Sequence, residues 1–231
     1  MRAPLKLIPR QSVVPILQGP LRGKKWIVGS GPHGYWTGFF EKEKQLAFAR
    51  AIKPDDTVWD IGANVGFYTL LAASRARQVY AFEPVSANVH DLERHLSLNG
   101  VSNTRVFEVA LGEKDGKCNF EPCVSRLQGY LSDDGGMSVT ARTIDSLTRE
   151  GLQPPTLIKM DIEGAEVKCL LGALETIRQM KPRIFLAAHW GRTKGPCMAL
   201  LTALGYQFDQ IGDDAEDLIC TSASVPGHIL H

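Results

Sequence analysis

Short apolar runs alternate with amphipathic segments along most of this chain. Uninterrupted apolar runs are typical of buried strands, and apolar residues that recur every three or four positions are typical of helices. The runs predict strands at 57–61, 78–82, 105–110, 138–142, 157–161, 183–189, 206–211 and 218–220. The periodic segments predict helices at 41–52, 67–74, 86–98, 165–180 and 197–204, with a helical turn at 144–147. Repeated strand–helix units predict an α/β fold in which helices cover a mostly parallel sheet.

Other parts of the chain depart from this pattern. Residues 26–40 are rich in glycine and aromatic residues, which indicates short strands and turns, and we interpret the aromatic side chains there as core packing. Prolines interrupt the first 20 residues, so we interpret this stretch as an irregular arm and not as a signal peptide. Between 112 and 137, Gly and Asp pairs favour hairpins or a mobile loop. We therefore divide the chain into an N-terminal arm with short strands, 1–40, and a main domain, 41–231.

The composition narrows the class of protein. With 231 residues and 44% hydrophobic content, the chain can bury the core of one α/β domain. Its net charge of +1 and its pI of about 7.7 give no general attraction to nucleic acid or to acidic membranes. No apolar run approaches the roughly 20 residues that span a bilayer. The cysteines include no CxxC pair, so we expect reduced thiols in a cytoplasmic protein, without disulfides or a metal site.

The carboxyl ends of the predicted strands carry the candidate chemistry, because ligands of open parallel sheets bind at that edge. The stretch VWDIGANVGFYTL leads from a strand through Asp60, Gly62, Asn64 and Gly66 into a helix near Phe67. Glycines let a ligand approach the backbone, but the spacing lacks the GxGxxG of a dinucleotide loop. An acid at position 60 suits an ammonium better than a pyrophosphate. This points to S-adenosylmethionine, which carries an ammonium and a sulfonium and no phosphate; a tight structural turn is the alternative.

Further acids follow the other predicted strands or open helices. Glu83 could accept both hydroxyls of a ribose, or interact only with a helix dipole. Asp161 and Glu163 could hold an amino group, bind a metal or act as a base. We interpret Glu166 as an acid of the first helical turn, and Glu41, which follows the aromatic residues, as an acid that opens the next helix.

One histidine is a candidate for the catalytic base, and two others are expected to be solvated. His189 ends an apolar strand at the candidate edge, where a neutral imidazole could take a proton from a hydroxyl near neutral pH. The alternative for His189 is a buried structural histidine. His90 and His95 are expected on the polar, solvated face of their helix.

Six motifs in this order resemble the FkbM family of methyltransferases: VWDIGANVGFYTL, AFEP, VALGEKDG, RTIDSL, IKMDIEGAEVKCLLGA and PRIFLAAH. They extend over residues 38–206, and MDIEGAE is the most specific block. The resemblance implies a class I, S-adenosylmethionine-dependent fold: a Rossmann-like sheet of seven mostly parallel strands, helices on both faces, and a short N-terminal strand and helix extension. It also implies methyl transfer to a hydroxyl of a small molecule or a sugar.

The resemblance also assigns individual residues. The implied cofactor contacts are Asp60, Gly62, Ala63, Asn64, Gly66 and Phe67 in the methionine loop, Glu83 and Pro84 at the ribose, Val109 and Ala110 beside the adenine, and Asp161 near the methionine end. Glu163 and His189 would lie near the acceptor. The base that removes the hydroxyl proton would be His189 or, failing that, Glu163 or Asp161.

The expected reaction is an in-line displacement in which the protein mainly holds two reactants aligned. The expected partner is a small-molecule or carbohydrate hydroxyl, without nucleic acid or metal, and we allow for a homodimer. Two alternatives stay open. An NAD-dependent oxidoreductase would suit Glu83, but the missing GxGxxG and the acid at Asp60 argue against it. A non-catalytic module of the same fold would bind the cofactor without turnover.

Overall fold

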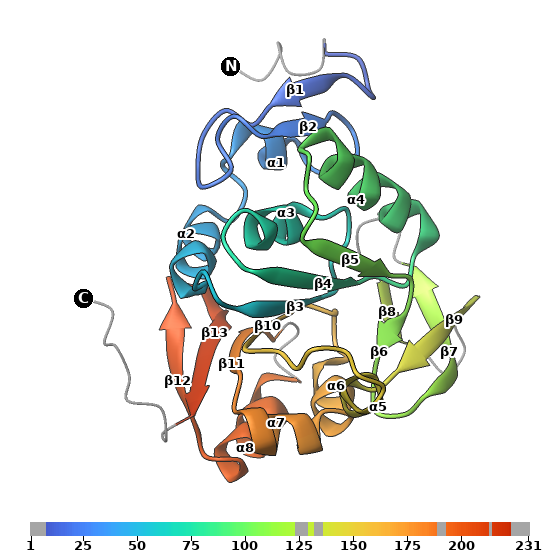
Figure 1. Cartoon of the computed structure of the whole chain (residues 1–231), viewed down its shortest axis with the longest axis vertical. Helices are drawn as coiled ribbons and strands as arrows, with labels where there is room; N and C mark the ends of the chain where they lie inside the picture. The colour runs from blue at the N-terminus through green and yellow to red at the C-terminus, as the bar shows by residue number, and fades with distance from the viewer. Residues whose placement is uncertain (1–7, 123–128, 132–135, 189–192, 213, 223–231) are drawn as a thin grey trace.

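A sheet of seven strands forms the centre of the described part of the protein (Figure 1). The computed structural model describes residues 8–122, 129–131, 136–188, 193–212 and 214–222. The strands lie in the order β12 (Tyr206–Ile211), β13 (Asp214–Ser222), β11 (Arg183–Ala187), β10 (Leu157–Met160), β3 (Thr57–Ile61), β4 (Gln78–Phe82) and β5 (Thr104–Phe107). Neighbours from β11 to β5 pair in parallel, whereas β13 is antiparallel to both β11 and β12. The prediction of seven mostly parallel strands is confirmed.

Side chains of the central strands alternate between two cores. In β3, Val58 faces one core, and Trp59 and Ile61 face the other. Val79 and Tyr80 repeat this alternation in β4, as the two-residue period of a strand requires. A parallel sheet that is covered on both faces has no solvent side. This is why these strands are mostly apolar, with Asp60 in β3 and Lys159 in β10 as buried charged exceptions.

Helices cover both faces of the sheet, as predicted. One face is covered by α2 (Lys42–Ala51), α3 (Phe67–Ala73) and α4 (Ser86–Leu98), which bury Phe48, Leu70 and Leu92. The other face is covered by α5 (Ile144–Arg149), α6 (Glu166–Leu171), α7 (Leu174–Met180) and α8 (Lys194–Ala203), which bury Leu147, Leu170, Ile177 and Leu201. Figure 1 shows the two helical layers on either side of the strands.

The helix predicted at 165–180 is divided into α6 and α7, with the break around Gly172. A Cβ at Gly172 would lie 2.0 Å from the carbonyl oxygen of Gly112, so another part of the chain passes directly against the break. The carboxylate of Asp145 accepts the N–H groups of Glu175 and Thr176 at 3.0 and 2.8 Å. Tertiary hydrogen bonds therefore replace helical ones at this point. The continuous apolar periodicity gave no sign of this exchange.

The strand predicted at 105–110 is also two segments. Strand β5 ends at Phe107, and the N–H of Val109 donates to the Phe107 carbonyl at 2.9 Å, a bond typical of a tight three-residue turn. Strand β6 (Ala110–Leu111) then joins a second sheet in the order β6–β9–β7–β8, with β9 (Met137–Arg142), β7 (Gly116–Pro122) and β8 (Gly129–Leu131). The antiparallel pairing of the consecutive strands β7 and β8 agrees with the hairpin alternative for residues 112–137, and β7 also pairs antiparallel with β9.

The N-terminal segment is more ordered than the sequence suggested. Strands β1 (Val13–Pro15) and β2 (Lys25–Ile27) form an antiparallel pair beside α4 (Figure 1), and a short helix α1 (His33–Thr37) follows, in agreement with the strand and helix extension that the resemblance implies. Ile16, Leu21 and Trp26 are buried in the same core as α3 and α4. For residues 8–20, the described part of the first 20, the interpretation as an irregular arm is therefore wrong. The domain boundary at residue 40 stays a prediction.

Most remaining elements agree with the sequence to within a few residues. The predicted limits of β3, β4, α4 and β12 match the structure, whereas α8 begins earlier and β13 extends further on both sides than predicted. In the described residues, no helix is both long enough and apolar enough to cross a membrane. The same residues contain no grouping of three or more His, Cys, Asp or Glu suited to a metal ion.

Candidate functional site

The glycine loop, residues 60–66, connects β3 to α3 at the carboxyl edge of the sheet. Gly62, Asn64 and Gly66 have φ angles of +77°, +52° and +90°, in the left-handed region that glycine and, less often, asparagine adopt. The N–H groups of Gly62 and Ala63 donate to the carbonyl oxygen of Phe82 at 3.0 and 3.1 Å. The loop is therefore tied to the end of β4 before it enters α3.

Close packing also excludes a side chain at both glycines of the loop. A Cβ at Gly62 would lie 2.0 Å from the carbonyl oxygen of Asp161, and a Cβ at Gly66 would lie 2.8 Å from the Cγ of Leu92. The first contact keeps the end of β10 directly against the loop, and the second seats α4 on the start of α3. Packing alone thus explains why positions 62 and 66 are glycine, as the structural-turn alternative requires. Both positions nevertheless lie at the edge of the sheet where a ligand would bind.

Glu83 supports the loop from the end of β4. Its Oε2 accepts the N–H of Asn64 at 2.9 Å, and its Oε1 accepts the N–H of Val85 and the Nδ2 of Asn88, both at 3.1 Å. Burial raises the pKa of Glu83, and these hydrogen bonds offset only part of the increase. A carboxylate offers about four acceptor positions, so Glu83 retains capacity for a further donor such as a ribose hydroxyl.

Asp60 lies completely inside the protein, beneath the loop. Its Oδ2 accepts the Thr69 hydroxyl at 2.6 Å, and its Oδ1 lies 3.3 Å from the Nζ of Lys159. Lys159 also donates to the Gly62 carbonyl oxygen at 2.9 Å, and its ammonium lies 5.4 Å from the centre of the Tyr68 ring. Asp60 therefore anchors the loop through Lys159. The contact of Asp60 with a ligand ammonium stays a prediction.

A buried lysine from α2 gathers further carboxylates at the same edge. The Nζ of Lys44 lies 3.0 Å from Asp217 Oδ1, 3.5 Å from Asp161 Oδ2 and 3.7 Å from Glu41 Oε1. Lys159 also lies 3.9 Å from Asp161 Oδ2. We call these residues the Lys44 cluster: Glu41, Lys44, Asp60, Lys159, Asp161 and Asp217.

Among the described residues, the Lys44 cluster contains more carboxylates than ammonium groups. Its described members supply the carboxylates of four residues and the ammonium groups of two. Burial alone would lower the pKa of Lys44, but the carboxylates of Asp161, Glu41 and Asp217 together raise it. Lys44 therefore keeps its charge. This local excess of carboxylates favours a cationic ligand.

The sequence missed Glu41, Lys44, Asp217 and Lys159 as members of the site. Glu41 and Lys44 precede the first central strand and reach the edge only because α2 packs across it. Asp217 lies in β13, which runs antiparallel to its neighbours, and the register of this strand places Asp217 opposite Ala187 at the end of β11. The position of Glu41 directly after the aromatic residues could have indicated a site residue, but from the sequence alone we interpret Glu41 as an acid at the start of a helix.

The remaining predicted residues lie at the same edge, with one exception. Glu163 is half-buried in the turn after β10, with φ +51°. Glu166 begins α6, and its Oε1 accepts the Gly164 N–H at 3.0 Å. Val109 and Ala110 follow the end of β5, and Pro84 and Phe67 flank Glu83 and the loop. The strand predicted to reach His189 ends at Ala187, and His189 itself is outside the described residues.

His95 is buried, and the expectation that it is solvated was wrong. Its Nδ1 contacts the Val65 carbonyl oxygen at 2.8 Å, its Nε2 accepts the Ile27 N–H at 3.2 Å, and its ring stacks on Trp26. Burial lowers the pKa of His95 to about 4. This neutral ring links β2, α4 and the glycine loop. His90 is exposed, as expected.

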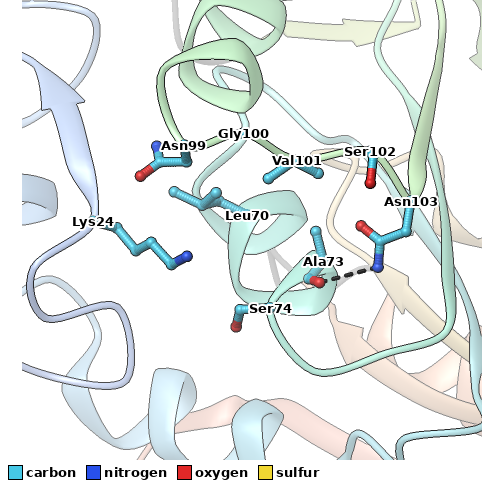
Figure 2. A pocket seen from close by; sticks show the side chains of 9 residues that line it. All are labelled: Lys24, Leu70, Ala73, Ser74, Asn99, Gly100, Val101, Ser102 and Asn103. Atoms are coloured by element: carbon cyan, nitrogen blue, oxygen red, sulfur yellow. Dashed lines mark hydrogen bonds between the residues drawn. The ribbon is translucent and has the colours of Figure 1, made fainter.

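A separate pocket of about 360 Å³ lies at the far end of α3, away from the glycine loop (Figure 2). It is lined by Lys24, Leu70, Ala73, Ser74, Asn99, Gly100, Val101, Ser102 and Asn103. Asn103 donates to the Ala73 carbonyl oxygen at 3.0 Å across one wall, and Lys24 is the charged group in the lining. The pocket contains none of the predicted residues, so we assign the candidate site to the strand edge.

The chain is similar in sequence to known methyltransferases. The model of the methyltransferase FkbM domain matches residues 60–211. Hexuronic acid methyltransferase AglP from Haloferax volcanii is 28% identical over 129 residues, which are 54% of this chain and 53% of that protein. The 2-O-methyltransferase NoeI from Sinorhizobium fredii is 28% identical over 155 residues, which are 56% of this chain and 62% of that protein.

A solved structure shares the fold. The crystal structure of methyltransferase FkbM from Methylobacillus flagellatus KT superimposes with a TM-score of 0.53 and 23% sequence identity, over 73% of this chain and 43% of that one. The matched part of each of these proteins is less than two thirds of its own length. The family model, in contrast, covers more than half of this chain and includes both the glycine loop and the MDIEGAE block. The chain belongs to the FkbM methyltransferase family.

Proposed function

We propose that this protein transfers the methyl group of S-adenosylmethionine to a hydroxyl oxygen of a sugar or another small molecule. The observation that carries the proposal is the excess of carboxylates in the Lys44 cluster, directly beside the glycine loop. S-adenosylmethionine carries both a sulfonium and an ammonium, so this charge suits it. Membership in the FkbM family supports the same chemistry. The names of the two relatives, a hexuronic acid methyltransferase and a 2-O-methyltransferase, support a sugar acceptor.

Residues of the strand edge would hold the cofactor, which supplies an activated methyl group when bound. The glycine loop and Asp161 would face its methionine end, and Glu83 would accept a ribose hydroxyl. Val109 and Ala110 would flank the adenine. Asp161 could contact the methionine end because its side chain is 20% exposed and two lysines hold its Oδ2 in place. These assignments fit the donor and acceptor chemistry of the residues present.

Calorimetric titration with S-adenosylmethionine and S-adenosylhomocysteine tests the cofactor. The variant is Glu83→Ala, and the matched control is Asn88→Ala, which removes one hydrogen bond to Glu83 but keeps the carboxylate. Loss of one hydrogen bond to a charged acceptor should weaken binding about tenfold to a hundredfold in Glu83→Ala. Asn88→Ala should bind nearly as tightly as the wild type. Equal losses in both variants would mean that Glu83 only supports the loop, and no binding by the wild type would refute the proposal.

Transfer of a labelled methyl group tests the reaction. We expect label on an oxygen of one member of a panel of free hexuronic acids, their methyl glycosides and neutral sugars. Cofactor binding without turnover on sugar and non-sugar hydroxyls would favour the non-catalytic module. Binding of labelled nicotinamide cofactor, without binding of S-adenosylmethionine, would favour the oxidoreductase. The homodimer and the cytoplasmic location stay predictions, and sedimentation of the purified protein tests the first.

A further inference from the structure

Glu41 has a backbone conformation that is unusual for its residue type. It precedes α2 with φ +44° and ψ +49°, in the left-handed region. A residue with a Cβ pays roughly 1–2 kcal/mol for this conformation, and such strain concentrates at functional sites. In the described structure its side chain makes no capping hydrogen bond to α2. The strained backbone thus directs Glu41 away from its own helix.

The carboxylate of Glu41 instead points at the candidate site. Its Oε2 accepts the hydroxyl of Tyr68 at 2.9 Å, and its Oε1 lies 3.7 Å from the Nζ of Lys44. Tyr68 is the second residue of α3 and follows directly on the glycine loop. Lys44 connects Glu41 to Asp161 on the other side. Both neighbours therefore hold Glu41 at the edge where the methionine end of the cofactor would lie.

Glu41 is also the most accessible carboxylate of the Lys44 cluster. Its side chain is 33% exposed, compared with 20% for Asp161. Those of Asp217 and Asp60 are 6% and 0% exposed. An acceptor molecule that enters from solvent can therefore reach Glu41 more readily than the deeper acids.

We propose that Glu41 is the carboxylate that receives the proton of the acceptor hydroxyl, an inference that rests on the proposed function. The acceptor oxygen bonds to the methyl carbon, and the electron pair of the carbon–sulfur bond stays with sulfur. The hydroxyl proton passes to a carboxylate oxygen of Glu41. An alcohol, a sulfonium and a carboxylate thus become an ether, a thioether and a carboxylic acid, so that atoms and charge balance.

The surroundings of Glu41 suit a proton acceptor. Burial raises the pKa of Glu41, and the carboxylates of Asp161 and Asp217 raise it further. The ammonium of Lys44 and the hydroxyl of Tyr68 act in the opposite direction, and the net pKa remains above that of an ordinary glutamate. A base whose pKa lies closer to the working pH transfers protons more effectively. The hydrogen bond from the Tyr68 hydroxyl lowers the pKa of Glu41 directly.

The first test requires neither cofactor nor acceptor. Glutamate carboxyl carbons are isotope-labelled in the full chain and titrated by NMR. We expect one resonance with a raised pKa that disappears in Glu41→Gln and remains in the control Glu43→Gln, an exposed acid of the same helical turn. Tyr68→Phe should raise that pKa further, because the carboxylate loses a donor. An ordinary pKa for Glu41, or no response to Tyr68→Phe, would overturn the inference.

The second test compares cofactor affinity with turnover. Glu41→Gln should weaken S-adenosylmethionine binding only modestly, because the other three carboxylates of the Lys44 cluster remain, but it should lose at least about a hundredfold in kcat, the usual contribution of a general base. Glu41→Asp, which keeps a carboxylate and tolerates the left-handed conformation, should recover part of this loss. Tyr68→Phe should move the acidic limb of the pH–rate profile to higher pH.

The outcomes of the second test distinguish this inference from the proposed function. A wild type that neither binds S-adenosylmethionine nor transfers its methyl group refutes the proposed function. Full turnover by a folded Glu41→Gln, with the acidic limb unchanged, refutes only the assignment of Glu41. Equal losses in Glu41→Gln and Glu41→Asp, with strongly weakened cofactor binding in both, would also refute it, because that pattern indicates a structural role.

Discussion

Replacing Gly62 with alanine tests whether the loop and the end of β10 touch as closely as the structure shows. Gly62 has φ +77°, and an added Cβ would lie 2.0 Å from the Asp161 carbonyl oxygen and 2.9 Å from the Cγ2 of Ile162. The first of these atoms belongs to the backbone. It cannot rotate away, so the chain after β10 must shift as a whole.

The expected cost has two parts. A left-handed φ costs a residue with a Cβ about 1–2 kcal/mol. Forcing an extra methyl group into a packed region costs a further 1–3 kcal/mol, roughly. We therefore expect Gly62→Ala to lower the free energy of unfolding by about 2–5 kcal/mol. At about 2–4 °C per kcal/mol for a chain of this size, the change in Tm is readily measurable.

A matched control separates the two parts. Gly205 has a similar φ of +82°, but a Cβ there would meet no heavy atom within 4 Å. Gly205→Ala should therefore lose only the conformational part, about 1–2 kcal/mol. Urea denaturation followed by tryptophan fluorescence gives both values, provided that the m-value is unchanged. Calorimetry should show weaker S-adenosylmethionine binding for Gly62→Ala alone, because only that change displaces Asp161.

Equal destabilisation by Gly62→Ala and Gly205→Ala would refute the steric part of this reasoning. It would mean that the Asp161 carbonyl can yield without cost, and that the glycine loop does not depend on contact with β10. Destabilisation of Gly62→Ala without any loss of cofactor binding would separate the packing of the loop from ligand recognition. In that case the structural-turn interpretation of Gly62 would suffice.

Two further substitutions test the packing around the sheet. Arg183 pairs with both carboxylate oxygens of Asp56 at 2.6 and 2.7 Å. Arg183→Met should lower the free energy of unfolding by about 3 kcal/mol in urea denaturation, because it leaves a buried acid without its cationic partner. The control Arg178→Met, at an exposed position, should lower it by almost nothing. Burial lowers the pKa of His95 to about 4 from 6.5, so the unfolded chain takes up a proton at a higher pH than the folded one. Stability should therefore fall as the pH drops from 6.5 towards 4, by up to about 1.4 kcal/mol per pH unit. His95→Gln should lose this contribution to the slope and the exposed His90→Gln should keep it; identical slopes in thermal melts would contradict the burial of His95.

Several features of the site could be read from contiguous residues. The left-handed positions Gly62 and Gly66 lie within one short motif, and Glu83 and Asp161 each follow an apolar run directly. The alternation of strands and helices then places all of them at one edge, because parallel strands end on the same side of a sheet. The loop, the acids and the edge were therefore accessible to reasoning from sequence.

Other features depended on residues far apart in the chain. The break at Gly172 comes from contact with Gly112 and from the carboxylate of Asp145, which the helical periodicity of the segment does not encode. His95 looked solvated because its helical face is polar in sequence. That face is covered by β2, whose docking site cannot be predicted from a local pattern.

The sequence by itself determined the α/β fold class with its mostly parallel sheet, the edge that carries the chemistry and the acids that end its strands. Each of these follows from local periodicity and from the handedness of strand–helix units. The tertiary structure alone decided which charges meet. Lys44 reaches Asp161 across 117 positions, and Asp217 arrives on an antiparallel strand whose register no local pattern fixes. Interactions between buried charges depend on distance and burial, and only the packed fold sets these two quantities.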